Sequence, residues 1–297
     1  MKIILFGCDG QLGWELQRSL AVLGELTSLD LDSTDFSADF SNSVALRNTV
    51  RALRPDVIVN AAAHTAVDEA EARPELAAQL NAHAPRLLAA EAASLDALLV
   101  HYSTDYVFEG TGNTPHDEDA PTAPVNVYGR TKLEGERFIR ASGCRHLILR
   151  SSWIYGVRGS NFARTILKLA AERDTLDVVD DQVGAPTGAD LLADVTAHAT
   201  RAVLCDGSLA GTYHAAASGE TSRFAYACFV IDWARRNRLP VRARADGVRA
   251  VPSNTLAGFA PRPLNSRLAT DRLRRAFGLT LPHWQAGVER MLTETCH

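Results

Sequence analysis

Short apolar runs recur along the first half of the chain and are separated by longer stretches of mixed polarity. They lie at residues 2–6 (KIILF), 26–31 (LTSLDL), 56–60 (DVIVN), 97–102 (ALLVHY) and 146–150 (HLILR). Runs of this length, apolar at most positions, are typical of strands that are buried on both faces of a parallel sheet. The pattern therefore predicts strands at these five places.

Between the runs, apolar residues recur at three- and four-residue intervals, which is the spacing of amphipathic helices. Strands that alternate with helices indicate the α/β class, with a doubly wound parallel sheet of the Rossmann type. Residues 109–124 and 251–267 are rich in turn-forming residues and are predicted to be loops. The predicted helices lie at residues 12–23, 43–53, 74–93, 127–142, 161–173 and 223–236.

Length and composition narrow the class of protein. The chain has 297 residues, of which 46% are hydrophobic and 22% charged, as in soluble globular proteins, and it is longer than one compact core usually holds. Its formal net charge of −4 argues against nucleic acid as a main partner, because neutralising phosphates needs a basic face. We find neither an export signal nor an apolar run of about 18 residues that predicts a membrane span.

The cysteines are arranged as expected for a cytoplasmic protein. They are odd in number and widely spaced, with no Cys-x-x-Cys pair. This arrangement favours reduced thiols in a cytoplasmic protein over a disulfide framework or a zinc site. The five are Cys8, Cys144, Cys205, Cys228 and Cys296.

Three glycines follow the first predicted strand and begin the first predicted helix. Gly7, Gly10 and Gly13 form the pattern Gly-x-x-Gly-x-x-Gly. Glycine allows a tight turn and a close approach of the backbone to a pyrophosphate, and the free N–H groups of a helix N-terminus attract phosphate. We therefore expect residues 1–155 to form an NAD(P)-binding domain. Residues 156–297 are expected to form mainly a smaller substrate-binding lobe, with some segments returning to the first domain.

A carboxylate near the end of the second strand bears on the choice of cofactor. Asp30 stands close to the position that contacts the adenosine ribose, and Asp32 is the alternative. A carboxylate there hydrogen-bonds the ribose hydroxyls and repels a 2′-phosphate. The sequence favours NADH and leaves NADPH open. After the third strand, residues 61–65 (AAAHT) are mostly small and let a cofactor lie against the backbone.

Tyr128 and Lys132 are four residues apart near the start of a predicted helix and hence share one of its faces. A free phenol titrates at about 10. A nearby ammonium lowers that pKa, so that the phenol exchanges a proton near neutral pH. Only three of the 31 basic residues are lysines, and Arg is too bulky to replace a compact ammonium here. The alternative is a plain surface pair on the helix.

Ser103, Thr104 and Asp105 follow the fourth predicted strand at the carboxyl edge of the sheet. A hydroxyl at this edge can hydrogen-bond the carbonyl oxygen that becomes an alcohol. We favour Thr104 over Ser103 for this role. Helix capping or turn formation is the alternative for all three residues.

These features occur together in the extended short-chain dehydrogenase/reductase family, which the chain resembles. Within it, the chain is similar to reductases of nucleotide-linked 4-keto sugars. The resemblance implies a Rossmann-type fold, NADPH or NADH as cofactor, a nucleotide-sugar substrate and a homodimer. The stretches that carry it span nearly the whole chain: LFGCDGQLGWELQRSL (from Leu5), RPDVIVNAAAHTAVDEAE, HYSTDYVFEG, NVYGRTKLEGE, SSWIYG, NFARTILKLA, DDQVGAPTGADLLAD and RPLNSRL.

The resemblance also implies roles for individual residues. Thr104, Tyr128 and Lys132 match the catalytic residues of the family, and Thr104, Asp105 and Trp153 match its substrate contacts. The flat face of Trp153 can pack on a sugar or base ring, with core packing as the alternative. Arg262 can pair with a diphosphate, or lie on the plain surface. The implied cofactor contacts are Gly7, Gly10, Gln11, Leu12, Asp30, Asp39, Phe40, Ala63, His64, Thr65, Tyr102, Tyr128 and Lys132.

A metal site is implied by the resemblance alone. Some members of the family are thought to bind Mg²⁺ at a dimer contact, and the matching carboxylates are Glu15, Asp190 and Glu294. Carboxylate oxygens suit Mg²⁺. Position 190 is Asp, where the family often has Glu, so the side chain is one methylene shorter.

Two alternatives to a reductase remain. A nucleotide-sugar 4,6-dehydratase or epimerase shares the fold, but a dehydratase commonly uses Asp-Glu after the threonine, and here Tyr106 follows Asp105. A non-catalytic dinucleotide-sensing subunit would usually have lost Tyr128 or Lys132, and both are present. We expect hydride transfer to the C4 keto carbon of a nucleotide sugar, with Tyr128 as the proton donor.

Overall fold

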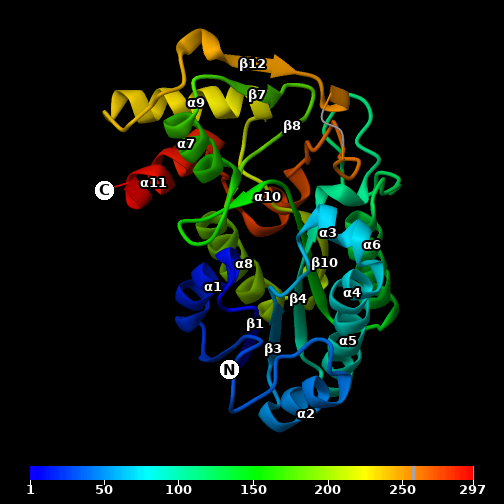
Figure 1. Ribbon diagram of the computed structural model, residues 1–297. Helices are drawn as coiled ribbons and strands as arrows, with labels where there is room; N and C mark the ends of the chain where they lie inside the picture. The colour runs from blue at the N-terminus through cyan, green and yellow to red at the C-terminus, as the bar shows by residue number, and fades with distance from the viewer. Residues whose placement is uncertain (256–257, 297) are drawn as a thin grey trace.

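The computed structural model describes residues 1–255 and 258–296. Its main sheet has six parallel strands in the order β10-β5-β4-β3-β1-β2 (Figure 1). Helices cover both faces of the sheet, which is why its central strands are apolar at nearly every position. The strands are β1 (Lys2–Phe6), β2 (Glu25–Leu29), β3 (Val57–Asn60), β4 (Leu98–Thr104), β5 (His146–Ser151) and β10 (Gly211–His214).

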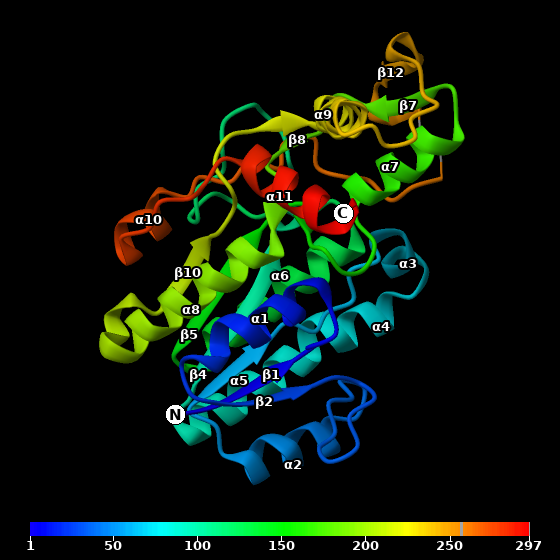
Figure 2. The same cartoon turned by 90° about the vertical axis from the view of Figure 1, so that its left-hand side faces the viewer.

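Two groups of helices pack on the two faces of this sheet (Figure 2). On one face, Leu16 and Leu192 share a buried core with Leu5 of β1. On the other face, Val50 and Leu88 share a second core with the strands. The first group comprises α1 (Gln11–Ala21) and α8 (Ala189–Cys205), and the second comprises α2 (Ser43–Leu53), α5 (Ala84–Leu95) and α6 (Val127–Ala141).

The helix predicted over residues 74–93 is present, but a π-helical segment interrupts its α-helical winding. α4 (Pro74–Ala78) leads into a π-helical segment, Gln79–His83, before α5 begins. In this segment the Asn81 side chain accepts the His64 N–H at 2.9 Å and donates to the His64 carbonyl at 3.0 Å. A π turn inserts an extra residue into the helix. Hydrophobic periodicity does not report such an insertion.

Strand β4 ends two residues later than predicted. Ser103 and Thr104 belong to the strand rather than following it. Successive side chains of a strand point to opposite faces of the sheet. The Tyr102 phenol therefore meets Thr196 of α8, while the Ser103 hydroxyl donates to Glu136 of α6 at 2.5 Å. Strand β2, in contrast, ends two residues earlier than predicted, so that Asp30 follows it directly.

The sequence pattern did not predict α8 and β10, which join the main sheet from the second half of the chain. α8 packs along α1, and β10 pairs in parallel with β5. Thr196 and Thr200 are fully buried on the inner side of α8. Two threonines on the buried side weaken the apolar stripe from which a helix is predicted.

Three helices of the second half of the chain build a smaller lobe with its own core, at the top of Figure 1. Tyr226, Trp233 and Trp284 are its large buried side chains. Its main elements are α7 (Phe162–Glu172), α9 (Arg223–Arg236), α11 (Trp284–Cys296) and the parallel strands β7 (Leu176–Val179) and β12 (Val248–Val251).

The fold also contains several short elements. β6 pairs with β9 in parallel, and β8 pairs with β11 antiparallel. The short elements are α3 (Val67–Ala72), α10 (Asp271–Phe277), β6 (Ile154–Tyr155), β8 (Val183–Gly184), β9 (Thr187–Gly188), β11 (Thr221–Ser222) and the 3-10 turns Asp105–Val107, Gly207–Leu209, Ala245–Gly247 and Ser253–Thr255. Of the predicted loop at 251–267, residues 256–257 lie outside the described residues.

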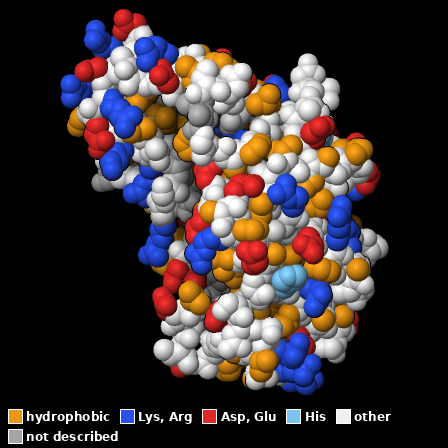
Figure 3. All heavy atoms as spheres, turned by 45° about the vertical axis from the view of Figure 1, so that its right-hand side comes forward, with side chains coloured by type: hydrophobic (Ala, Val, Ile, Leu, Met, Phe, Trp, Pro, Cys, Tyr) orange, Lys and Arg blue, Asp and Glu red, His pale blue; other side chains and the backbone are white. Residues whose placement is uncertain are grey.

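All five cysteines are free. No helix in the described part of the chain is both long and apolar enough to cross a membrane. On the face drawn in Figure 3, basic and acidic side chains are intermingled.

Candidate active site

The glycine loop follows β1 at the carboxyl edge of the sheet. Gly7 has φ +82°, a left-handed conformation that favours glycine, and a Cβ there would lie 2.6 Å from the Ala62 backbone nitrogen. A Cβ at Gly13 would lie 1.8 Å from the Gly7 carbonyl oxygen, so α1 can approach the loop only without a side chain. No side chain caps α1, which begins after Gly10. Its first N–H groups are therefore free to bind phosphate, as a dinucleotide requires.

A cavity of about 400 Å³ runs along this edge of the sheet, from the glycine loop to the start of α6. Most of the site residues predicted from the sequence line this cavity. Gln11 also ties the loop to the smaller lobe, because its Oε1 accepts the Gly156 N–H at 2.9 Å. The predicted site residues that line the cavity are Gly10, Gln11, Leu12, Ala63, Thr65, Tyr102, Thr104, Asp105, Tyr128, Lys132 and Trp153.

The other predicted cofactor residues lie outside this lining. Asp30 is held at the rim of the glycine loop, where its Oδ2 accepts the Asp9 N–H at 2.8 Å. Phe40 is buried with its ring centre 5.6 Å from that of Phe6, and Asp39 accepts the Ser41 N–H at 2.8 Å. His64 is buried as well, and its Nε2 lies 3.8 Å from a Glu69 oxygen.

Thr104, Tyr128 and Lys132 meet at the carboxyl edge. The Asn126 side chain caps α6 by accepting the Gly129 N–H at 2.8 Å, which orders the first turn that carries Tyr128. The Tyr128 phenol lies beside the Thr104 hydroxyl. Lys132 is 3% exposed, and its ammonium donates to the Tyr102 carbonyl at 2.6 Å. The three polar groups thus converge where β4 ends and α6 begins.

The charges at the site differ from the expectation that Lys132 lowers the pKa of Tyr128. Burial raises the pKa of the Tyr128 phenol above its usual value, and the neighbouring Thr104 hydroxyl opposes this rise. Burial lowers the pKa of Lys132 to about 8. Lys132 does not lower the pKa of Tyr128, because its ammonium is directed at the Tyr102 carbonyl of β4.

Asp105 is the acidic group of the site. It begins the 3-10 turn after β4, and its Oδ1 accepts the Thr104 hydroxyl at 3.1 Å. Burial raises the pKa of the Asp105 carboxyl to about 6. Ser266 lies beside this carboxyl, yet the buried Oδ2 has no partner of normal hydrogen-bond geometry among the described residues. Such an atom is suited to a ligand hydroxyl, which would satisfy it.

Sequence reasoning missed Arg223, the first residue of α9. Its guanidinium carbon lies 3.7 Å from the centre of the Trp153 ring, and the residue lines the catalytic cavity. Burial lowers the pKa of Arg223, while Tyr106 and Asp105 oppose that shift. No carboxylate in the described part of the chain lies within ion-pair distance of it. The one sequence feature that points to Arg223 is a cation in the first turn of a helix, where the dipole disfavours it.

A second cavity, of about 720 Å³, adjoins the first at Trp153 and Arg223. Trp153 has φ +49°, a conformation that is rare for residues other than glycine. The second cavity has an aromatic wall and two guanidinium groups. Arg262 pairs with Asp68 at 2.8 Å. The aromatic and basic lining residues are Trp153, Tyr155, Phe162, Tyr226, Phe259, Arg223 and Arg262.

The three carboxylates proposed for Mg²⁺ line a separate, small cavity. Arg290 lies among them, with its Nε 2.9 Å from Glu294 Oε1 and its Nη1 3.5 Å from Asp190 Oδ2. Glu15, Asp190 and Glu294 do not bring their oxygens within 4.8 Å of one another in the described structure. The carboxylates of one chain therefore do not form a magnesium donor set. The metal site remains a prediction.

A glycine loop after the first strand of a parallel sheet, with Thr, Tyr and Lys joined at the carboxyl edge, defines a short-chain dehydrogenase/reductase of the extended type. The family model described as RmlD substrate binding domain matches residues 1–296. The chain belongs to this family.

Relatives of the chain agree with this assignment. The dTDP-4-dehydrorhamnose reductase of Salmonella typhimurium is 53% identical over 294 residues, covering 99% of this chain and 98% of that protein. A solved dTDP-4-dehydrorhamnose reductase of Clostridium acetobutylicum has a TM-score of 0.89 and 33% identity, and covers 100% of both chains. That of Bacillus anthracis, in complex with NADP, has a TM-score of 0.87 and 34% identity, and covers 99% of both chains.

Proposed function

We propose that this chain reduces the C4 keto group of dTDP-4-dehydro-L-rhamnose to give dTDP-L-rhamnose, with NADPH or NADH as the reductant. The observation that carries the proposal is the convergence of Thr104, Tyr128 and Lys132 on the wall of a cavity that begins at the glycine loop. The name of a 53%-identical relative supports the substrate. In this proposal residues 1–155 bind the cofactor, and residues 156–297 mainly form the substrate lobe.

The protein residues act on the carbonyl oxygen of the substrate. The bound nicotinamide cofactor supplies the hydride. Tyr128 donates its proton to the oxygen as the alcohol forms, and the Thr104 hydroxyl donates a hydrogen bond to the same oxygen. Lys132 holds the ribose of the cofactor beside the phenol. Proton transfer by a positioned acid of this kind typically accelerates a reaction about 10²- to 10⁴-fold.

The substrate nucleotide is assigned to the second cavity. Arg223 and Arg262 offer planar guanidinium groups, which pair with phosphate oxygens through two hydrogen bonds. The aromatic wall around Trp153 suits a flat base or a sugar face. The buried Oδ2 of Asp105 is a candidate acceptor for a sugar hydroxyl.

Replacing Arg223 with Met is expected to raise the KM for the nucleotide sugar about 30-fold or more, because truncating a buried charged partner costs about 2–5 kcal/mol. Cofactor affinity should stay within about twofold of the wild type. Arg236→Met on the same helix removes an exposed arginine and should leave both constants unchanged. Steady-state kinetics with each substrate varied in turn measures these effects. An unchanged KM in Arg223→Met contradicts the assignment.

Replacing Asp30 with Asn is expected to lower the preference for NADH over NADPH about tenfold, which corresponds to about 1.4 kcal/mol. The carboxylate repels a 2′-phosphate, and the amide does not. The ratio of kcat/KM for the two cofactors measures the preference. Asp32 is exposed, and Asp32→Asn is the matched control, expected to behave as the wild type. A lower ratio in Asp32→Asn alone would transfer the ribose contact to that residue.

The reductase activity is tested by the loss of nicotinamide absorbance when the purified protein meets dTDP-4-keto-L-rhamnose, with NADH and NADPH in parallel. Stoichiometric oxidation of the cofactor is expected. A dehydratase or epimerase would recycle its nicotinamide, and a sensing subunit would bind cofactor without turnover. Either outcome would overturn the proposal.

We also propose that the protein acts in the cytoplasm as a homodimer, with neither nucleic acid nor membrane as a partner. Sedimentation equilibrium measures the oligomeric state, and repeating it with Mg²⁺ and with a chelator tests whether Glu15, Asp190 and Glu294 hold an ion in the dimer.

A further inference from the structure

His101 lies on β4 beside Lys132 and has no part in the chemistry described above. Its side chain is buried on the face of the sheet that α6 covers. Its Nε2 lies 3.5 Å from Lys132 Nζ, and its Nδ1 lies 3.1 Å from the side-chain nitrogen of Asn60. Burial lowers the pKa of His101 well below its usual range, and Lys132 lowers it further. The ring is therefore neutral and carries a single N–H.

The neighbours of the ring determine which nitrogen carries that hydrogen. The Asn60 side-chain oxygen accepts the Ala62 N–H at 3.1 Å, and this contact sets the orientation of the amide. The Asn60 NH₂ group therefore faces His101 Nδ1. Because an NH₂ group only donates, Nδ1 must accept, and the hydrogen of a neutral imidazole is then on Nε2. The Nε2–H of His101 points at Lys132.

We propose that His101 is a positioning residue that disfavours the ammonium form of Lys132. An ammonium only donates hydrogen bonds, so it meets the Nε2–H of His101 donor to donor. A neutral amine accepts from that N–H and still donates to the Tyr102 carbonyl. The amino group of Lys132 thus gains and loses its proton within the working pH range. The inference rests on the proposed function for the role of Lys132 in catalysis.

The other charged groups around Lys132 do not favour the neutral amine. Glu136, one turn further along α6, raises the pKa of Lys132. Arg150 of β5 binds that carboxylate at 2.7 Å, and Ser103 of β4 donates to it as well. Tyr128 is a neutral phenol whose pKa is raised by burial, and Asn81 on the π-helical segment is uncharged. Burial lowers the pKa of Lys132, and among these neighbours His101 is the side chain that presents a ring nitrogen to the ammonium, at 3.5 Å.

A direct measurement is available because the chain has only three lysines, Lys2, Lys132 and Lys168. Labelling with [13Cε]lysine gives three NMR resonances. Lys2→Arg and Lys168→Arg, both at exposed positions, assign the signal of Lys132 by elimination. In the wild type, Lys132 should titrate with a pKa of about 8.

The two variants of His101 differ in one hydrogen-bond donor. His101→Asn keeps an acceptor near the position of Nδ1 and removes the donor that faces Lys132. Its Lys132 midpoint should move up by roughly one pH unit. His101→Gln keeps an N–H near the position of Nε2 and should titrate as the wild type. The pH profile of kcat/KM should show the same change. The part of the profile that reflects the titration of Lys132 should move to higher pH in His101→Asn and stay unchanged in His101→Gln.

The outcomes separate the two proposals. An equal Lys132 midpoint in the wild type and His101→Asn overturns the role of His101, whatever the turnover. A shifted midpoint in a protein that does not oxidise the cofactor supports the positioning role of His101 and overturns the proposed reductase activity. If His101→Asn does not fold, Asn60→Asp replaces the NH₂ group with an acceptor. The carboxylate draws the His101 hydrogen to Nδ1 and also attracts the ammonium, so the Lys132 midpoint must rise for both reasons, and no rise overturns the proposal.

Discussion

Replacing Tyr128 with Phe is expected to lower kcat by about 10²- to 10⁴-fold, the usual effect of losing a general acid. The phenyl ring keeps the packing against Tyr106, whose ring centre lies 5.6 Å away, so the fold should be unchanged. Only the hydroxyl that donates the proton is lost. Stopped-flow or steady-state measurement of cofactor oxidation gives the rate, and fluorescence titration gives the cofactor affinity.

A matched tyrosine distinguishes chemistry from packing. The Tyr213 phenol donates to the Leu209 carbonyl at 2.8 Å, on the far strand β10 of the sheet. Tyr213→Phe removes a buried hydroxyl there and should leave kcat within about twofold, since it is remote from the reacting atoms. Near wild-type turnover in Tyr128→Phe would remove Tyr128 from the role of acid. Loss of cofactor binding in the same variant would point to a structural role instead.

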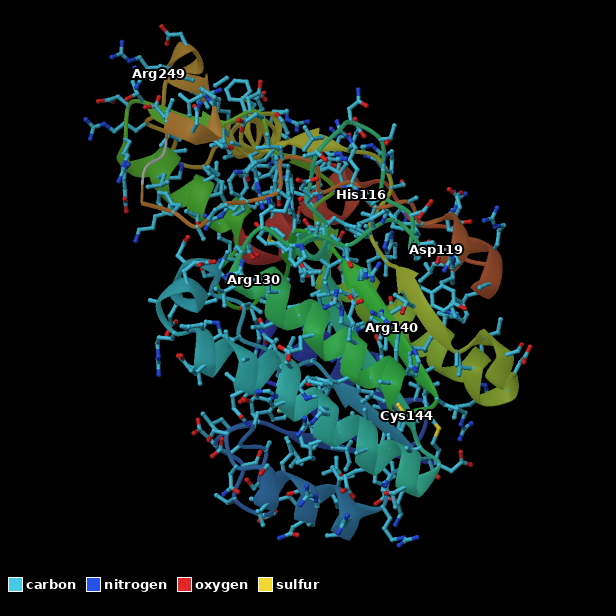
Figure 4. The ribbon with its side chains drawn as sticks, turned by 90° about the vertical axis from the view of Figure 1, so that its right-hand side faces the viewer. His116, Asp119, Arg130, Arg140, Cys144 and Arg249 are labelled. Carbon is cyan, nitrogen blue, oxygen red and sulfur yellow. The ribbon has the colours of Figure 1, made fainter. Side chains whose placement is uncertain are left out.

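Replacing Glu136 with Ala is expected to lower the free energy of unfolding by about 3–5 kcal/mol, because it leaves the guanidinium of Arg150 buried without its carboxylate. Glu136 is fully buried and accepts two hydrogen bonds from Arg150, at 2.8 and 2.7 Å. Arg140 of the same helix, labelled in Figure 4, adds a third at 2.9 Å. Urea denaturation at pH 7 measures the loss.

The same ion pair gives the stability a dependence on pH. Its partners hold the pKa of Glu136 below the usual value, although burial alone would raise it. A carboxyl whose pKa is lower in the folded state stabilises the fold above its unfolded pKa, and this contribution is lost as the pH falls through the folded pKa. The pH dependence of unfolding below neutrality should therefore be shallower in Glu136→Ala than in the wild type.

Two variants serve as controls for Glu136. Glu134 lies on the same helix and forms no ion pair with the described residues, so Glu134→Ala should change the stability by less than about 0.5 kcal/mol. The double variant Glu136→Ala/Arg150→Met removes both charges and should be more stable than Glu136→Ala alone. A loss below about 1 kcal/mol in Glu136→Ala would show that Arg150 finds other partners.

The local sequence determined the elements that carry the chemistry. Apolar runs located β1, β3 and β5, because strands covered on both faces have little room for polar side chains. The glycine pattern located the loop before α1, since Gly7 and Gly13 are the residues that such close backbone contacts allow. The four-residue spacing of Tyr128 and Lys132 placed both on one helix face. These properties follow from neighbours along the chain.

Other features were decided by contacts between segments far apart in the sequence. Arg223 reaches the site only because α9 begins beside Trp153, and no local pattern records that proximity. The π turn at Asn81 depends on the backbone of His64, 17 residues earlier in the chain. Which ring nitrogen of His101 carries the hydrogen is set by the Asn60 side chain, on the neighbouring strand of the sheet. Hydrogen bonds and burial of this kind set orientation and charge, and they exist only once the strands and helices have come together.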